Sequence, residues 1–352
     1  MSIPVSSSHT QGEVFFLNLR FLLIVCVFVG NAIEPLIWRM DSMYSLYQWI
    51  FTFHIPLFVF VTGHFAKNNL KGAPGRKVML QIGLQYLIFQ SLYSIMDAIW
   101  FQVDSVHRSF FAPYLLLWFL ASHLGWRAFM LLTRQWPPSR QLALSVILAV
   151  LVGYLPIDGV WLSISRTFVF LPFFVLGHHY SGRLLSYFQK PKIRIAAICA
   201  SLVWLLILGL GLLHIAPGWL YGSLTYKELG SAAWMTGLFR LLLYPVQLLA
   251  GLAFLGFVPI KAGRITEWGS RTLYVFLLHG FVVRIAALSP IYKHIDNQVG
   301  ALLLIIAAAA LTILLTHPLV RRCTAPLIEP PVQWLLAPER HTLNQPSTAS
   351  KS

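Results

Sequence analysis

The sequence predicts an all-α membrane protein that crosses the bilayer about ten times. Of its 352 residues, 57% are hydrophobic and only 11% are charged, and the mean hydropathy is +0.71. A soluble domain carries about 25% charged residues. Apolar runs long enough to cross a bilayer recur along nearly the whole chain. Such runs form helices because a helix satisfies its own backbone hydrogen bonds. These observations favour a polytopic helical bundle.

Glycine, proline and charged residues separate the apolar runs and mark the ends of the spans. The fifth span is the weakest because it is short and ends at Pro156 and Asp158. Residues 1–14 form a polar tail without a basic segment, so we expect the first span to be retained rather than cleaved as part of a signal peptide. Residues 15–335 then form the membrane domain, and the polar residues 336–352 form a disordered tail. The ten expected spans are residues 15–37, 45–66, 78–101, 112–131, 141–157, 167–187, 194–215, 232–258, 269–288 and 299–320.

The charge pattern predicts the orientation. The net charge is +15, from 26 Lys and Arg against 11 Asp and Glu. In a soluble protein this balance would indicate a nucleic-acid partner, but in a membrane protein basic loops that fix the topology explain it, so we expect a lipid bilayer and no nucleic acid. With the N-terminus inside, the predicted inner loops carry more than twice as many Lys and Arg residues as the outer loops. Both termini are therefore expected in the cytoplasm. The three cysteines show no motif spacing, which predicts neither a disulfide framework nor a metal site.

Three polar residues in the first two spans are candidate catalytic residues. Arg20 lies within the first span, where an isolated charge is costly and marks a functional site. Asn31 follows eleven positions later, on the same face of a helix and roughly 16 Å away. In the second span His54 is expected at nearly the depth of Asn31, where an imidazole can act as a general base near neutral pH. The alternative for His54 is a structural histidine that bonds to a neighbouring helix.

Further polar residues gather at the two predicted membrane surfaces. Guanidinium groups at the outer surface suit phosphate or carboxylate groups on lipid-linked or polymeric sugars, although snorkelling at span ends also explains them. At the inner surface a cationic rim suits the phosphates of a nucleotide-bearing donor, although basic inner loops also serve topology. The expected outer set is Glu34, Arg39, His107, Arg108, Arg166 and Arg240. The expected inner set is Arg264, Glu267, Ser270, Arg271 and Thr272, followed in the ninth span by His279.

Five short segments carry a resemblance to a known family. They are Phe16–Arg20 with Phe28–Asn31, Phe53–Gly63, Leu117–Leu120, Arg166–Gly177 and Gly269–His279. In this order and on about ten spans, they resemble the acyltransferase-3 family of integral membrane O-acyltransferases, and within it the fucose 4-O-acetylase-like bacterial proteins. The resemblance covers about residues 15–325. It implies transfer of an acyl group, usually acetyl, from cytoplasmic acyl-CoA to a hydroxyl of an envelope glycan, without a metal, in a bacterial cytoplasmic membrane.

The charge pattern and the resemblance together suggest roles for individual residues. We expect Arg20, Arg271 and Ser270 to bind the donor, and Glu34, Arg166, Arg240 and His279 to contact the acceptor. The sequence departs from the family at Asn31, where the family has the histidine to which it assigns the task of the base.

An amide cannot take a proton at physiological pH. We therefore expect His54 to act as the base and Asn31 to orient the acceptor or the acyl carbonyl. The alternative is a catalytically inactive relative that serves as a transporter or conduit for a lipid or sugar. A third reading is a homo-oligomer or a membrane partner in an envelope-synthesis complex.

Overall fold

The computed structural model describes residues 10–101, 110–156 and 161–336. Within these ranges every regular element is a helix, which confirms the all-α class. Eight helices are long and apolar enough to cross a membrane, and a bent pair of helices forms a ninth candidate. The longer helices of the described residues are α1 (Gln11–Ile33), α2 (Asp41–Ala66), α3 (Gly72–Met96), α4 (Trp118–Leu132), α5 (Pro138–Leu151), α6 (Ile164–His179), α8 (Pro191–Gly209), α10 (Trp234–Phe254), α12 (Thr272–Leu288) and α13 (Gln298–Leu315). The shorter ones are α7 (Arg183–Phe188), α9 (Pro217–Tyr221), α11 (Arg264–Ser270) and α14 (Pro318–Ile328).

Eight of the ten expected spans coincide with the eight long apolar helices. The first helix begins at Gln11, before the expected start, because Thr10 and Glu13 form a reciprocal capping box. The expected fifth span is a shorter apolar helix that ends at Tyr154. The expected span 167–187 is wrong at its end, because α6 stops at His179 and α7 follows as a separate short helix. The C-terminal residues 337–352 lie outside the described residues.

The expected ninth span, 269–288, is part of a bent pair in which α11 and α12 meet at 72°. The bend is held against α1. Gly269 packs so closely on the carbonyl of Leu17 that a β-carbon would collide with it. The next residue of α1, Asn18, donates hydrogen bonds to the carbonyls of Pro259 (2.8 Å) and Lys261 (3.2 Å), which anchors the loop before α11. The bend therefore sits at a fixed place along α1.

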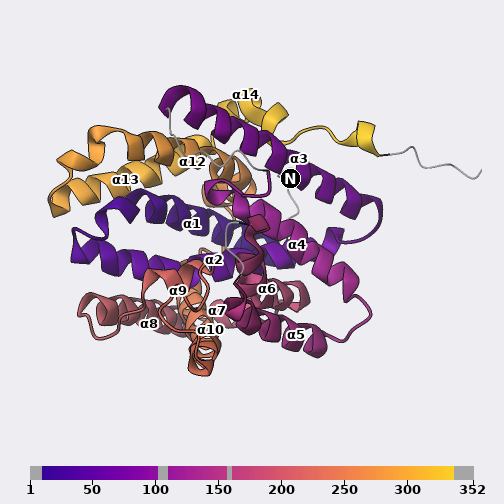
Figure 1. Ribbon diagram of the computed structural model, residues 1–352, viewed down its shortest axis with the longest axis horizontal. Coiled ribbons are helices and arrows are strands. Elements are labelled where there is room, and N and C mark those ends of the chain that lie inside the picture. The colour runs from indigo at the N-terminus through magenta and orange to yellow at the C-terminus, as the bar shows by residue number, and fades with distance from the viewer. Residues whose placement is uncertain (1–9, 102–109, 157–160, 337–352) are drawn as a thin grey trace, which may run out of the picture.

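In the bundle α1 and α2 lie side by side at the centre, with α12 and α13 against α1 and with α6, α8 and α10 against α2 (Figure 1). The chain alternates between two ends of this bundle. We call them the 34–40 end, where α1 passes into α2, and the 67–71 end, where α2 passes into α3. The expected topology makes the 34–40 end the outer one.

The bundle has the exposed apolar surface that a bilayer requires. Large aliphatic side chains are exposed along α8, α10 and α13, among them Leu206, Leu249 and Leu303. Apolar patches of this extent on a helical bundle match lipid rather than water. The chain is thus a multi-pass membrane protein, in agreement with the sequence.

Candidate functional site

A cavity of about 320 Å³ lies between α1, α2, α4, α6, α9 and α12. Its volume is near the lower limit for small-molecule sites, about 300–1,000 Å³. Five of the residues predicted from the sequence line it, namely Asn31, Glu34, His54, Arg166 and His279. The order of the lining residues along each helix divides the cavity into three layers between the two ends of the bundle.

The layer nearest the 67–71 end is an apolar floor. It consists of Val27 on α1, Phe58 on α2, Phe119 on α4 and Phe276 on α12, each the lining residue of its helix that is nearest this end. The ring centroids of Phe58 and Phe119 lie 5.6 Å apart, as do those of Phe119 and Phe276. These edge-to-face and tilted contacts are the favourable arrangements of aromatic rings. The floor separates the cavity from the residues beneath it.

The middle layer is polar and consists of Asn31, His54 and His279. The expectation that Asn31 and His54 lie at similar depth agrees with this placement. Asn31 Nδ2 lies 3.4 Å from His279 Nε2. The ring of Phe51 meets His54 edge to face at 4.5 Å and fixes the plane of the imidazole.

The hydrogen bonds of the two histidines define which ring nitrogen is basic. His54 Nδ1 lies 2.9 Å from the carbonyl of Ile50, and His279 Nδ1 lies 2.9 Å from the carbonyl of Val275. A carbonyl only accepts, so Nδ1 carries the hydrogen in both rings and Nε2 carries the lone pair. His279 Nε2 accepts from the Asn31 amide. Within the described residues His54 Nε2 has no hydrogen-bond partner, which leaves it free to take a proton from a ligand.

The outer layer, toward the 34–40 end, consists of Glu34, Tyr47, Arg166 and Tyr221. Tyr47 donates to the Tyr221 hydroxyl at 3.0 Å, and Tyr221 donates to Glu34 Oε1 at 3.5 Å. Arg166 donates from Nε to the Tyr221 carbonyl at 3.3 Å and lies over the ring of Trp118. Burial raises the pKa of Tyr221 above its ordinary value, so this hydroxyl stays protonated and remains a donor.

Sequence reasoning did not identify Tyr47 or Tyr221. A signal existed for Tyr47, because it shares a helical stripe with Phe51, His54 and Phe58. Tyr221 ends a short helix in a connection, where no periodicity points to a cavity.

The predicted donor residues lie beyond the floor, around the bend between α11 and α12. Arg20 does not line the cavity; its Nη2 donates to Thr272 Oγ1 at 2.8 Å, and its guanidinium lies over the ring of Phe65. Ser270 donates to the Glu267 carbonyl at 2.7 Å. Arg271 donates to the carbonyl of Thr316 at 3.2 Å. Arg20, Ser270 and Arg271 therefore lie at the 67–71 end, away from the cavity histidines of the middle layer.

Arg240 and Arg39 lie outside the cavity. Arg240 is 2% exposed, donates to the Trp219 carbonyl at 2.7 Å and lies over the Trp219 ring. It holds α9, which carries Tyr221, and does not line the cavity as the predicted acceptor site required. Arg39 donates to the carbonyl of Tyr292 at 2.8 Å. The other two residues of the expected outer set, His107 and Arg108, lie outside the described residues.

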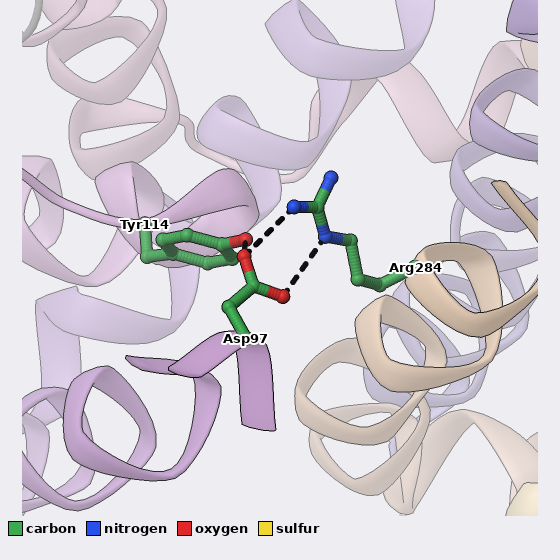
Figure 2. Close-up of polar contacts among 3 residues, drawn as sticks. All are labelled: Asp97, Tyr114 and Arg284. Atoms are coloured by element: carbon green, nitrogen blue, oxygen red, sulfur yellow. Dashed lines mark hydrogen bonds and ion pairs between the residues drawn. The ribbon is translucent and has the colours of Figure 1, made fainter. Parts of the chain in front are cut away.

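A buried ion pair braces the wall of the cavity. Arg284 on α12 donates to both carboxylate oxygens of Asp97, at 3.1 and 2.8 Å, and the Tyr114 hydroxyl donates to the same carboxylate (Figure 2). Asp97 is 1% exposed. The brace joins the end of α3, the segment that enters α4, and α12; residues of the last two, Leu115 and Val283, line the cavity. No local pattern in the sequence links these three residues.

Comparisons of the chain with protein-family models, with curated proteins and with solved structures found no match. Within the described residues no group of three or more His, Cys, Asp or Glu side chains is placed to hold a metal ion. The residues that bear on function are those of the three-layered cavity and those beneath its floor.

Proposed function

We propose that the protein is a membrane acyltransferase that moves an acyl group, acetyl by its resemblance, from cytoplasmic acyl-CoA to a hydroxyl of an envelope carbohydrate. The observation that carries this proposal is the free Nε2 of His54 in a cavity shared with Asn31, Glu34 and Arg166. A neutral imidazole with an unoccupied lone pair is the group that a hydroxyl nucleophile needs as its general base.

In the proposed reaction the acceptor hydroxyl lies against His54. Its oxygen attacks the thioester carbonyl carbon while His54 Nε2 takes its proton. The new C–O bond forms, the C–S bond breaks, and the proton passes to the departing thiolate to give the CoA thiol. Asn31 donates one amide hydrogen to His279 and keeps a second for the oxygen of the thioester carbonyl, where negative charge develops.

The donor reaches this point from the 67–71 end. Its phosphates bind near Arg20 and Arg271, because cations at this end balance their charge. The thioester must then pass the aromatic floor formed by Val27, Phe58, Phe119 and Phe276. The rings of Phe58, Phe119 and Phe276 pack against one another there, so in this proposal donor binding separates them before transfer takes place.

The test compares His54→Ala with His64→Ala in cells that express the full chain. His64 lies on the same helix, stacks on Phe16 at 4.1 Å and does not line the cavity. Mass spectrometry of envelope glycans measures acyl incorporation. We expect His54→Ala to lower incorporation about 10²–10⁴-fold, as for loss of a general base, and His64→Ala to leave it nearly unchanged.

Unchanged incorporation in His54→Ala would remove His54 from the mechanism. Identical glycans in cells with and without the protein would overturn the proposed function.

A conduit for a lipid or sugar is the second candidate. Asn31 does not titrate, and a polar cavity closed on one side by an apolar floor also fits one access state of a transporter. Asn31→His separates the two. Acylation by the unmodified chain supports the enzyme, whereas acylation that appears only in Asn31→His identifies an inactive relative.

A further inference from the structure

The outer layer of the cavity carries balanced charge. Among the residues that line the cavity, Glu34 and Arg166 are the two that carry a full charge when the histidines are neutral. The two charges attract each other across the cavity, yet they form no direct ion pair. Arg166 is held instead by the ring of Trp118 and the carbonyl of Tyr221. The layer thus presents a carboxylate and a guanidinium separately, with no net charge.

The same layer has both donors and acceptors to spare. The hydrogen of Tyr47 goes to Tyr221 and that of Tyr221 goes to Glu34, so this relay ends on the carboxylate. Glu34 accepts from Tyr221 and also interacts with the Tyr47 hydroxyl, and its carboxylate keeps further lone pairs for a ligand. Within the described residues, Arg166 Nη1 and Nη2 donate no hydrogen bond. One cavity wall therefore offers an anionic acceptor and a cationic donor at once.

This pairing matches hydroxyl groups better than anions. A hydroxyl both donates and accepts, so neighbouring hydroxyls of a sugar can satisfy Glu34 and Arg166 together. A carboxylate or phosphate only accepts; it would satisfy Arg166 but would face the Glu34 carboxylate at short range in a cavity of low dielectric. Phe51 and Trp118 also line the cavity and supply apolar surface for the C–H groups of a sugar ring.

We propose that Glu34, Tyr47, Arg166 and Tyr221 form a subsite for a neutral sugar and reject an acceptor that carries carboxylate or phosphate at this position. The inference rests on the proposed function and names its acceptor class. It differs from the sequence-based expectation that the outer arginines bind anionic groups, because Glu34, a member of the same expected outer set, lines the cavity together with Arg166.

The test measures binding in the absence of acyl-CoA. The purified full chain in nanodiscs is examined by saturation-transfer difference NMR with a panel of methyl hexopyranosides, the matching hexuronates and the hexose 6-phosphates. We expect saturation transfer to at least one neutral glycoside and none to the anionic sugars. Alkyl glycosides with long chains form a further arm: stronger binding than the methyl glycosides indicates a lipid-linked neutral acceptor, and equal binding indicates a free or polymeric one.

Variants test the role of the carboxylate. Glu34→Gln should weaken the neutral sugar about tenfold and allow the hexuronate to bind, because it removes the charged acceptor and the repulsion together. Tyr221→Phe should weaken the neutral sugar without admitting the hexuronate. The matched control is Glu228→Gln, an exposed carboxylate at the same end that bonds to Thr225 and does not line the cavity; it should change nothing. Unfolding midpoints verify that each variant folds.

Three outcomes would overturn the inference: an anionic sugar that binds the unmodified chain as well as any neutral one, a panel in which no neutral sugar binds, or Glu34→Gln with an unchanged preference. Because the assay needs no donor, its failure is distinct from that of the proposed function. If cells acylate the glycan but the purified chain binds anionic sugars in the NMR assay, only the neutral-sugar subsite is rejected. If the purified chain binds neutral sugars but cells show no acylation, only the proposed enzymatic activity is rejected.

Discussion

The two ends of the bundle are built differently. At the 67–71 end, helices touch backbone to backbone: Gly177 on α6 packs on the carbonyl of Phe60, and Gly269 before the bend packs on that of Leu17. At the 34–40 end, polar side chains link the helices, namely Asp97 with Arg284 and Arg240 with the Trp219 carbonyl. A pocket beside Phe60 at the 67–71 end holds only about 70 Å³, whereas the cavity toward the 34–40 end holds about 320 Å³.

This difference gives the two substrates different routes. The proposed acceptor finds a formed cavity with its polar groups in place. The proposed donor finds Arg20 bonded to Thr272 and a closed aromatic floor above it. Preorganisation at one end and closure at the other would keep the thioester from water until the acceptor has bound. Four predictions probe this contrast.

The largest expected effect concerns the brace of the open end. Arg284→Met leaves the 1% exposed carboxylate of Asp97 without its cation, and loss of one partner of a buried pair costs about 3–5 kcal/mol. Asp97→Asn should cost less, because Arg284 is 23% exposed and can turn toward water. Unfolding of the purified variants in detergent measures both. The stabilising role of this ion pair would be contradicted if the two single variants lost the same free energy of unfolding. It would also be contradicted if the double variant were less stable than Arg284→Met.

The second prediction concerns the floor. Asn31, Val27 and Leu23 follow one stripe of α1, with Asn31 in the cavity, Val27 in the floor and Leu23 0% exposed beneath it. The test uses a variant without native cysteines and a small impermeant thiol reagent added outside. The reagent should label Asn31→Cys at least a hundredfold faster than Leu23→Cys, and this ratio of rates corresponds to a free-energy difference of about 2.7 kcal/mol.

Adding Phe119→Ala should open the floor and thereby reduce the difference in labelling rate between Asn31→Cys and Leu23→Cys. Equal rates at the two positions would contradict a closed floor, and faster labelling from the cytoplasm would reverse the expected orientation.

Hydropathy and local pattern predicted the class, most of the spans and the gathering of Asn31 and His54. The bend between α11 and α12 escaped prediction because the polar residues Ser270 and Arg271 suit the start of a span equally well. The contact of Gly269 with α1, which holds the bend, is long-range in the sequence. Arg20 and Asn31 share a helix face as expected, but the bend supplies Thr272 as a partner for Arg20 on the far side of the floor.

Contacts between residues far apart in the sequence could not be predicted from local pattern either. Asp97 and Arg284 lie far apart in the sequence, and no periodicity connects them. Arg240 was expected at the acceptor as a member of the outer polar set. The sequence could not show that the Trp219 carbonyl occupies its guanidinium.

The third prediction concerns the closed end. Gly177→Ala places a β-carbon against the Phe60 carbonyl, so α2 and α6 must move apart at a cost of about 1–3 kcal/mol. The control is Gly83→Ala in α3, where a β-carbon meets nothing within 4 Å; it should stabilise the helix by about 0.5–1 kcal/mol. Thermal unfolding in nanodiscs compares the two. A Gly177→Ala variant as stable as Gly83→Ala would show that backbone contact does not close this end.

The smallest expected effect is a change in the KM for the donor without a change in the KM for the acceptor. Arg20→Lys keeps the charge beneath the floor but loses the guanidinium fork that bonds Thr272, and one charged hydrogen bond corresponds to about a tenfold rise in the KM for acyl-CoA. The KM for the acceptor should stay the same, because Arg20 does not line the cavity. Lys77→Gln, an exposed cation at the same end, serves as the control for general loss of charge. If Arg20→Lys instead raised the KM for the acceptor, the floor would not divide the two substrates, and the distinction between the two ends would fail.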